Sequence, residues 1–277
     1  MSVPDLRGRT IIMSGGSRGI GLAIALRAAR DGANIALLAK TAEPHPRLEG
    51  TIFSAAEQIE AAGGQALPIV GDVRDDETVV AAVEQTLARF GAIDVVVNNA
   101  SAIDVSPSET IAMKRYDLMQ DVNTRGTFLL SRTGGPHLRD VANPHGLTLS
   151  PPLSLDPKWD GGHLAYTLAK FGMSMCTLGM AAEYAADGIA FNSLWPRTLI
   201  ATAAVQNLLG GDEAMARSRR PEIVADAAHH ILTRPARSTT GNFFIDDEVL
   251  AQAGVSDLSG YAYVADAELQ IDLVLDE

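Results

Sequence analysis

Tyr166 and Lys170 are the two residues whose types and spacing most directly indicate chemistry. They are four positions apart, so they share one face if this stretch is helical. A phenol with a pKa near ~10 is a poor base at neutral pH unless a neighbouring positive charge stabilises its anion. A lysine ammonium supplies such a charge, and the tyrosine can then donate a proton to a carbonyl oxygen or accept one from an alcohol. The pair therefore predicts acid–base chemistry at a carbonyl or alcohol group.

A glycine-rich segment, SGGSRGIG, lies between a predicted strand and a predicted helix. Its glycines permit a tight turn, close approach of the backbone to a ligand and close packing of the helix. The unpaired N–H groups at the start of the helix can then bind a pyrophosphate. The segment predicts a dinucleotide site, with contacts from Gly15, Ser17, Arg18, Gly19, Ile20 and Gly21.

The residues after the second predicted strand favour one form of the dinucleotide. A site for NAD would place Asp or Glu there, to bind the 2′-hydroxyl of the ribose. The chain has Ala39, Lys40 and Thr41 instead, and Arg18 lies in the glycine-rich turn. Two cations without a carboxylate favour a 2′-phosphate. We therefore predict NADP(H) rather than NAD(H), with Lys40 among its ligands.

The elements that position these residues alternate between short apolar runs and helical stretches. Runs such as NIALLAK and IDVVVNNAS are apolar at consecutive positions, as expected for strands buried on both faces of a parallel sheet. Repeated strand–helix units with right-handed crossovers predict an α/β fold, a doubly wound, Rossmann-type and mostly parallel sheet with helices on both faces. The predicted helices include Ile20 to about Asp31, a long one within Tyr116 to Arg139, and about Ala165 to Ala186.

We expect a single domain over residues 1–277 with two irregular parts. Residues 199–220 lack a clean period and are a candidate lid over the substrate. The apolar half of this segment, ATAAVQNLL, indicates an apolar small-molecule substrate. The acidic tail at about 246–277 is expected to pack on a neighbouring subunit.

Four motifs in this order resemble those of the short-chain dehydrogenase/reductase family: GGSRGIG, NNAS at 98–101, DVNTRGT at 121–127 and YTLAK at 166–170. The resemblance extends from residue 14 to about residue 200. It implies an oxidoreductase that moves a hydride between a nicotinamide cofactor and a carbonyl or secondary alcohol. It also implies that Tyr166 and Lys170 are catalytic and contact the cofactor.

The resemblance implies roles for further residues. Asn123 is similar to the family's helix-disrupting asparagine, which holds a proton-relay water, and Asn98 is expected to stabilise the sheet. Asp72 matches the residue that hydrogen-bonds the adenine amine. The other cofactor contacts implied in this way are Asn99, Ala100 and Pro196. Pro196 is followed by Arg197 where the family usually has glycine, which puts the register of the nicotinamide contacts in doubt.

The family also implies a catalytic serine, usually thirteen positions before the tyrosine, where this chain has Leu153. Ser150 directly ends the apolar run LTL, whereas Ser154 lies beyond two prolines. Side chains at the carboxyl edge of a parallel sheet face the ligand crevice, and loops absorb insertions. We therefore predict Ser150 as the catalytic serine, with Ser154 as the alternative. The displaced serine also motivates a rival hypothesis, a dinucleotide-binding sensor or scaffold with little turnover.

Composition narrows the classes of partner. Lys and Arg number 22 against 34 Asp and Glu, a net charge of −12 that repels nucleic acid and anionic membranes. The only cysteine is Cys176, and no signal peptide or spanning segment is evident, so we predict a cytoplasmic protein. No residue cluster has metal-ligand spacing, so no metal is predicted. The family resemblance implies a homodimer or homotetramer built on helices around 113–138 and 165–186.

Overall fold

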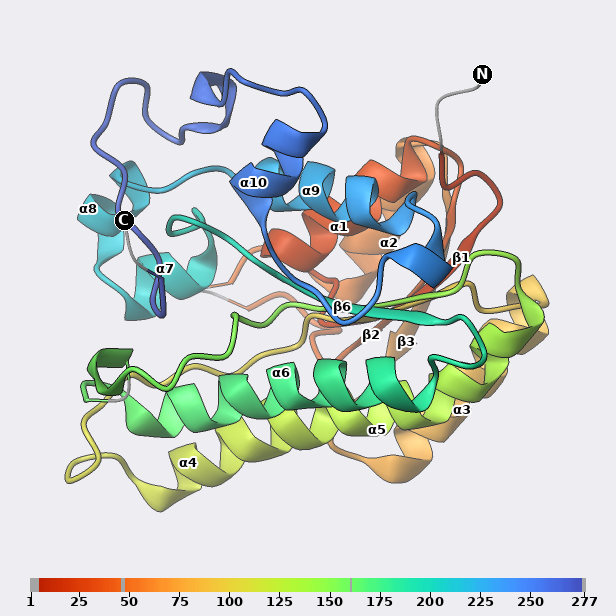
Figure 1. The fold of residues 1–277 in the computed structure, drawn as a ribbon, viewed down its shortest axis with the longest axis horizontal. Coiled ribbons are helices and arrows are strands. Elements are labelled where there is room, and N and C mark those ends of the chain that lie inside the picture. Colours follow the sequence, from red (N-terminus) through yellow and green to blue (C-terminus); the bar gives the residue numbers. More distant parts are fainter. Residues whose placement is uncertain (1–4, 46–47, 160, 276–277) are drawn as a thin grey trace.

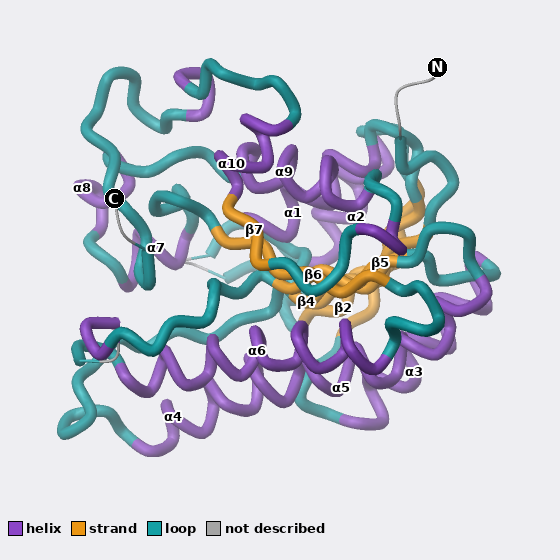
Figure 2. Tube along the Cα trace, viewed as in Figure 1, coloured by secondary structure: helices purple, strands orange, loops and turns teal. Residues whose placement is uncertain are grey.

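Seven parallel strands form the central sheet of the computed structural model, which describes residues 5–45, 48–159 and 161–275. Their order across the sheet is β3-β2-β1-β4-β5-β6-β7. Figure 2 shows the strands at the centre of the molecule, between helices on either side. The order reverses beside β1, and every neighbouring pair is parallel. The strands are β1 (Thr10–Ser14), β2 (Asn34–Ala39), β3 (Gln65–Val70), β4 (Val95–Asn98), β5 (His145–Thr148), β6 (Ala190–Trp195) and β7 (Phe243–Ile245).

Helices cover both faces of this sheet (Figure 1). Along β1, Ile11 and Met13 pack with one group of helices and Ile12 packs with the other, because successive side chains of a strand point to opposite faces. The first group is α1 (Gly19–Ala29), α2 (Ile52–Ala61), α9 (Glu222–Leu232) and α10 (Asp246–Gln252). The second group is α3 (Asp76–Phe90), α5 (Gly126–Gly134) and α6 (Leu164–Glu183). The prediction of a doubly wound parallel sheet with helices on both faces is confirmed.

The long helix predicted within Tyr116 to Arg139 is interrupted. The chain forms α4 (Met113–Met119), a π-helical segment η1 (Gln120–Arg125), then α5, and a 3₁₀ segment over Gly135–Asp140. Asn123 lies in the π-helical segment and is fully buried. Its side-chain oxygen accepts a hydrogen bond from Ala102 N at 2.7 Å, and its Nδ2 donates to Ala102 O at 3.0 Å. Asn123 thus holds the segment that follows β4, and both polar atoms of its side chain are occupied.

The C-terminal tail contacts its own subunit, and the expectation that it packs on a neighbouring subunit stays a prediction. Leu199 N donates to Gln270 O at 2.9 Å, and Asp272 N donates to Arg197 O at 3.0 Å. The tail therefore runs beside the candidate lid segment, which contains two short helices, α7 (Ala203–Leu208) and α8 (Gly211–Ala216) (Figure 1). Arg197 is an internal anchor here, since its guanidinium pairs with Asp247 and Glu248.

None of the helices in the described part of the chain combines the length and the apolar character that crossing a membrane would require.

The turn between β1 and α1 is held by the end of β4. Ser14 Oγ accepts hydrogen bonds from Asn99 N and Ala100 N, each at 3.2 Å. Asn99 Nδ2 donates to Gly15 O at 2.7 Å. Gly15 has a φ of 74°, and a Cβ at this position would lie 2.8 Å from Ala100 Cα. Glycine is therefore required at residue 15 both for its backbone conformation and for the space it leaves.

Replacing Gly15 should lower the free energy of unfolding more than replacing Gly8, a glycine that is needed only for its backbone conformation. Gly8 also has a positive φ, 69°, but a Cβ there would meet nothing within 4 Å. We expect Gly8→Ala to lower the free energy of unfolding by about 1–2 kcal/mol, the cost of the left-handed conformation. Gly15→Ala should cost at least about 1 kcal/mol more, because the Ala100 backbone must shift. Urea denaturation measures both, and an equal loss in the two variants would contradict this account of the turn.

Candidate active site

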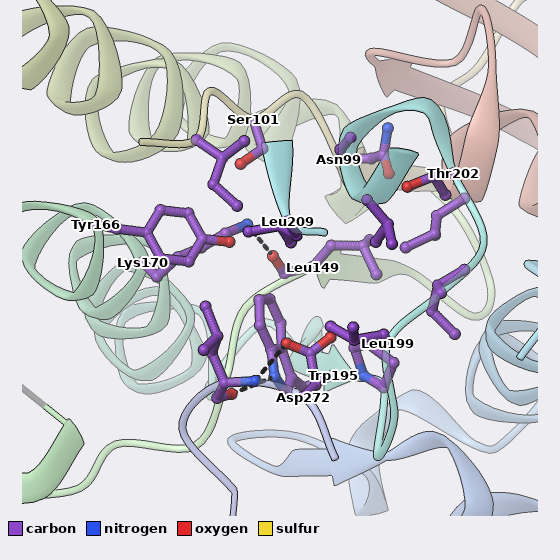
Figure 3. Close-up of a pocket in the computed structure, with 17 residues that line it drawn as sticks. Asn99, Ser101, Leu149, Tyr166, Lys170, Trp195, Leu199, Thr202, Leu209 and Asp272 are labelled. Atoms are coloured by element: carbon purple, nitrogen blue, oxygen red, sulfur yellow. Dashed lines mark hydrogen bonds between the residues drawn. The ribbon is translucent and has the colours of Figure 1, made fainter. Parts of the chain in front are cut away.

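Tyr166 and Lys170 lie one turn apart on α6 and are both buried, with 5% and 3% of their surface exposed. Both line a pocket at the carboxyl ends of the strands (Figure 3). Most of the remaining lining is apolar. It comprises Ile20, Ile103, Leu149, Trp195, Pro196, Leu199, Ile200, Ala204, Val205, Leu209 and Leu273, with Asn99, Ser101, Thr202 and Asp272 as the other polar residues.

The ammonium of Lys170 is anchored at the end of β5. Its Nζ donates to Leu149 O at 2.9 Å and lies 5.1 Å from the ring centroid of Trp195, within range of a cation–π contact. Burial lowers the pKa of Lys170 to about 7, although the charge of Asp272 opposes that shift. Near neutral pH, Lys170 is therefore only partly protonated. The negative charge of Asp272 favours the protonated, charged form.

The Tyr166 phenol is neutral in this pocket. Burial raises its pKa above the ordinary value, and the Asp272 carboxyl raises it further. A neutral phenol is a proton donor, which is the form needed to protonate a carbonyl oxygen. Deprotonation of the same group is favoured by a positive charge beside it.

Ser150 does not line this pocket. It is fully buried, and its hydroxyl shares a 2.9 Å hydrogen bond with Ser193 Oγ, which in turn donates to Thr177 Oγ1 at 2.9 Å. The strand end therefore directs this hydroxyl between β5, β6 and α6 rather than toward Tyr166. The alternative, Ser154, lies in the following loop and accepts a hydrogen bond from Asp156 N. It is also absent from the pocket lining.

Of the cofactor residues predicted in the glycine-rich turn and at the ends of β4 and β6, some line the pocket and others lie outside its lining. Ile20, Asn99 and Pro196 line the pocket beside Tyr166 and Lys170. The other residues of the glycine-rich turn and Ala100 lie outside its lining. A Cβ at Gly19 would lie 3.3 Å from Thr202 Cγ2, which brings the turn to the edge of the pocket.

The start of α1 fits a dinucleotide phosphate. The helix has no side-chain cap at its N-terminus, so its first N–H groups are available to an anion. Asn98, at the end of β4, stabilises the fold rather than facing a ligand. Its Nδ2 donates to Ser131 Oγ of α5 at 2.8 Å.

Lys40 and Asp72 meet at the ends of β2 and β3. Lys40 Nζ lies 3.5 Å from Asp72 Oδ2, and its side chain remains 58% exposed. Arg74 donates to both carboxylate oxygens of Asp72. Partial burial alone would raise the pKa of Asp72, but the hydrogen bonds from Arg74 and the charge of Lys40 lower it to about 2.

The second predicted cation, Arg18, donates to the backbone oxygens of Glu49 and Gly50.

Two pocket residues were not predicted from the sequence. Asp272 and Leu273 belong to the C-terminal tail yet line the same pocket as Tyr166. Figure 3 shows Asp272 beside Trp195. Leu273 O accepts a hydrogen bond from Trp195 Nε1 at 3.1 Å. The available signal was the single acidic residue inside the apolar run LQIDLVL, which is unusual for a solvated tail.

Comparison with known proteins identifies the family. The family model described as short chain dehydrogenase matches residues 9–211. Hydroxysteroid dehydrogenase-like protein 2 of Xenopus laevis is 53% identical over 272 residues, which are 98% of this chain and 64% of that protein. The chain thus spans somewhat less than two thirds of the length of this relative.

Solved structures share the fold. A short chain dehydrogenase from Mycobacterium thermoresistibile is 57% identical, with a TM-score of 0.93 over 98% of this chain and 96% of that chain. Carveol dehydrogenase from Mycobacterium avium, solved in complex with NAD, has a TM-score of 0.75 at 20% identity over 88% of this chain and 97% of its own. On the family match, the relative and the pocket that brings Tyr166 and Lys170 together, the chain belongs to the short-chain dehydrogenase/reductase family.

Proposed function

We propose that the protein is an NADP(H)-dependent oxidoreductase that moves a hydride between the nicotinamide and a carbonyl or secondary alcohol of an apolar small molecule. The observation that carries the proposal is the burial of Tyr166 and Lys170 in one largely apolar pocket at the carboxyl ends of the strands, where ligands bind in open α/β sheets. The uncapped start of α1 and the glycine-rich turn adjoin that pocket.

In this proposal the chain's own residues supply proton transfer and orientation. The nicotinamide, when bound, gives or takes the hydride. Tyr166 donates its phenolic proton to the substrate oxygen in reduction and takes a proton from the alcohol in oxidation. The Lys170 ammonium, held by Leu149 O, stabilises the phenolate that results and contacts the nicotinamide ribose. The apolar lining excludes water, which strengthens each of these electrostatic contacts.

Asn123 and Ser150 act through other residues. Because both polar side-chain atoms of Asn123 bind Ala102, we assign this residue to positioning the segment after β4, which includes Ser101 and Ile103 of the pocket lining. Ser150 supports the ends of β5 and β6 through Ser193. The expected catalytic serine is therefore replaced, in this proposal, by a site that relies on Tyr166 and Lys170.

Tyr166→Phe and Ser150→Ala separate these roles. For the best ketone from a broad panel of ketones, aldehydes and alcohols, Tyr166→Phe should lower kcat/KM by about 100-fold or more with little change in NADPH affinity, because the proton donor is lost. Ser150→Ala should lower kcat/KM by less than about 10-fold and the free energy of unfolding by about 1 kcal/mol, the worth of one hydrogen bond. Steady-state kinetics and urea denaturation measure the two effects.

Other outcomes would change the proposal. A loss in Ser150→Ala as large as that in Tyr166→Phe would make Ser150 part of the chemistry. Binding of NADPH without turnover of any compound in the panel would instead favour a dinucleotide-binding sensor or scaffold. No binding of NADPH or NADH would exclude both functions.

The preference for NADP(H) is proposed from charge. The end of β2 presents the exposed ammonium of Lys40 and no carboxylate in the next position, and Arg18 lies in the turn nearby. The contact of Lys40 with Asp72 weakens its field only in part, because Arg74 already binds both oxygens of that carboxylate. A 2′-phosphate would gain charge-assisted hydrogen bonds here, whereas a 2′-hydroxyl would gain little from a cation.

Reversing the charge at residue 40 tests the preference. Lys40→Asp should raise the Kd for NADPH by about 10-fold or more and change the Kd for NADH by less than about 3-fold, because a hydrogen bond to a charged group is lost only with the 2′-phosphate. Fluorescence titration of each cofactor measures both constants. Lys114→Asp, the same charge change on the exposed surface of α4, is the control and should affect neither. Equal losses for the two cofactors would show that Lys40 is not a ligand of the 2′-phosphate.

A homo-oligomer is proposed from the outer surface of the helices. Met173 and Met180 of the run MSMCTLGMA are buried, but Met175 and Leu178 are 55% and 44% exposed. Leu164 and Leu168 continue this apolar stripe along α6. A contiguous exposed apolar stripe on a helix indicates a protein–protein contact.

A single charge on this stripe should disrupt the contact. We expect Met175→Glu to shift the mass measured by light scattering toward the monomer, because a charge buried in an apolar interface is costly. Glu183→Gln, near the end of the same helix, is the control and should leave the mass unchanged. A monomeric wild-type protein at micromolar concentration would contradict the proposal.

A further inference from the structure

The tail places a carboxyl group inside the pocket. Asp272 lies near the end of the chain, yet it lines the same pocket as Tyr166 and Lys170 (Figure 3). Nothing in the chemistry proposed above uses this group. Asp272 is half-buried, and a carboxylate that loses part of its water in a largely apolar pocket without a cationic partner is unfavourable.

The backbone on both sides of Asp272 is fixed. Asp272 N donates to Arg197 O at 3.0 Å, and the preceding Ile271 forms an antiparallel bridge with Thr198. On the other side, Leu273 O accepts from Trp195 Nε1 at 3.1 Å. The side chain of Asp272 is thereby directed into the pocket by contacts with β6 and the segment that follows it.

No cation of the described residues neutralises this carboxyl by direct contact. Arg197, whose backbone binds Asp272, points its guanidinium at Asp247 and Glu248 instead. Lys170 acts on Asp272 through its charge but forms no ion pair with it, and its hydrogen bonds go to Leu149 O and the Met173 sulfur. Burial raises the pKa of Asp272 to about 7, although Lys170 opposes the shift.

Only one of the two carboxyl oxygens of Asp272 has a hydrogen-bond partner among the described residues. Its Oδ1 accepts a hydrogen bond from Leu273 N at 2.6 Å, whereas Oδ2 has no hydrogen-bond partner among the described residues. Leu149, Trp195 and Leu199 are its apolar neighbours in the lining. On this half-buried residue the acceptor meets less competing water than it would on the open surface, which favours a hydrogen bond to a donor in the pocket.

We propose that Asp272 is a specificity-determining residue that contacts the substrate, selecting carbonyl compounds with a hydroxyl group remote from the reacting carbonyl and rejecting those with a carboxylate there. This inference rests on the proposed oxidoreductase function. The reacting oxygen lies at Tyr166, the apolar body of the substrate lies against the lining, and the hydroxyl donates to Asp272. A carboxylate in the same place faces like charge at close range, and such an unfavourable contact is an effective means of discrimination.

Three ring ketones that differ at one position test this selection. They are 4-hydroxycyclohexanone, cyclohexanone and 4-oxocyclohexanecarboxylate, assayed with saturating NADPH at pH 7, where Asp272 and Lys170, each with a pKa of about 7, both keep part of their charge. For the wild-type protein we expect kcat/KM for the hydroxy ketone to exceed that for cyclohexanone by about 10-fold or more, the worth of a hydrogen bond to a charged group. The carboxylate ketone should lie at least about 10-fold below cyclohexanone.

Variants of Asp272 should remove each part of the selection. Asp272→Leu, which keeps the branched shape of the side chain but not the acceptor, should bring the hydroxy ketone within about 3-fold of cyclohexanone. Asp272→Asn, which removes the charge and retains an acceptor for Leu273 N, should raise kcat/KM for the carboxylate ketone by about 10-fold or more. Asp266→Asn is the matched control, because it removes an exposed charge from the same tail and should change no ratio. The Asn variant keeps the test decisive if the Leu variant does not fold.

Three results would overturn the inference. Unchanged ratios in Asp272→Asn would show that the carboxyl does not face the substrate. A rise in the Kd for NADPH with equal losses for all three ketones would assign Asp272 to the cofactor. Turnover of other ketones by the wild-type protein without turnover of 4-hydroxycyclohexanone would exclude the hydroxyl preference while the oxidoreductase function stands. Failure of that function is distinct, since it appears as no turnover of any compound in the broad panel.

Discussion

The hydrogen bond from Lys170 Nζ to Leu149 O is the contact on which the site depends. It fixes a buried ammonium at the carboxyl end of β5, and through the helix it fixes Tyr166 one turn away. Taking an ammonium out of water is costly; the charge of Asp272 favours the protonated form, and a carbonyl oxygen and the Trp195 ring contact the ammonium. The doubly wound sheet supplies these partners by ending β4, β5 and β6 at a common edge, opposite the start of α1. The proton chemistry we propose follows from that arrangement.

The sequence predicted the sheet well because its evidence is local. Ile11, Ile12 and Met13 are apolar in succession, and the structure buries them on alternate faces of a parallel sheet. The Tyr166–Lys170 spacing likewise predicted two side chains on one face of a helix, and both line the pocket. The sequence predicted one long helix within Tyr116 to Arg139, and only the family resemblance indicated a disruption at Asn123. The structure has a π-helical segment at this point, where Asn123 binds the Ala102 backbone, a tertiary contact that no helical period signals.

The residues that sequence reasoning placed least well depend on distant partners. Ser150 lies two residues after the end of β5, and its hydroxyl is directed by Ser193 and Thr177, which belong to elements farther along the chain. The sequence gives no measure of which way a hydroxyl turns at a strand end. Asp272 enters the pocket because the tail pairs with Thr198, a non-local contact that no periodic pattern signals. The same contacts hold the tail on its own subunit.

Transfer of a labelled hydride tests the central proposal most directly. The protein is incubated with a ketone that it reduces and with NADPH carrying deuterium at both C4 positions of the nicotinamide, and the alcohol product is analysed by mass spectrometry and NMR. The account predicts one deuterium on the carbinol carbon of each product molecule, because the hydride passes directly from the nicotinamide while Tyr166 supplies only the proton on oxygen. Product alcohol without deuterium on that carbon, or no product from any ketone despite bound NADPH, would contradict it.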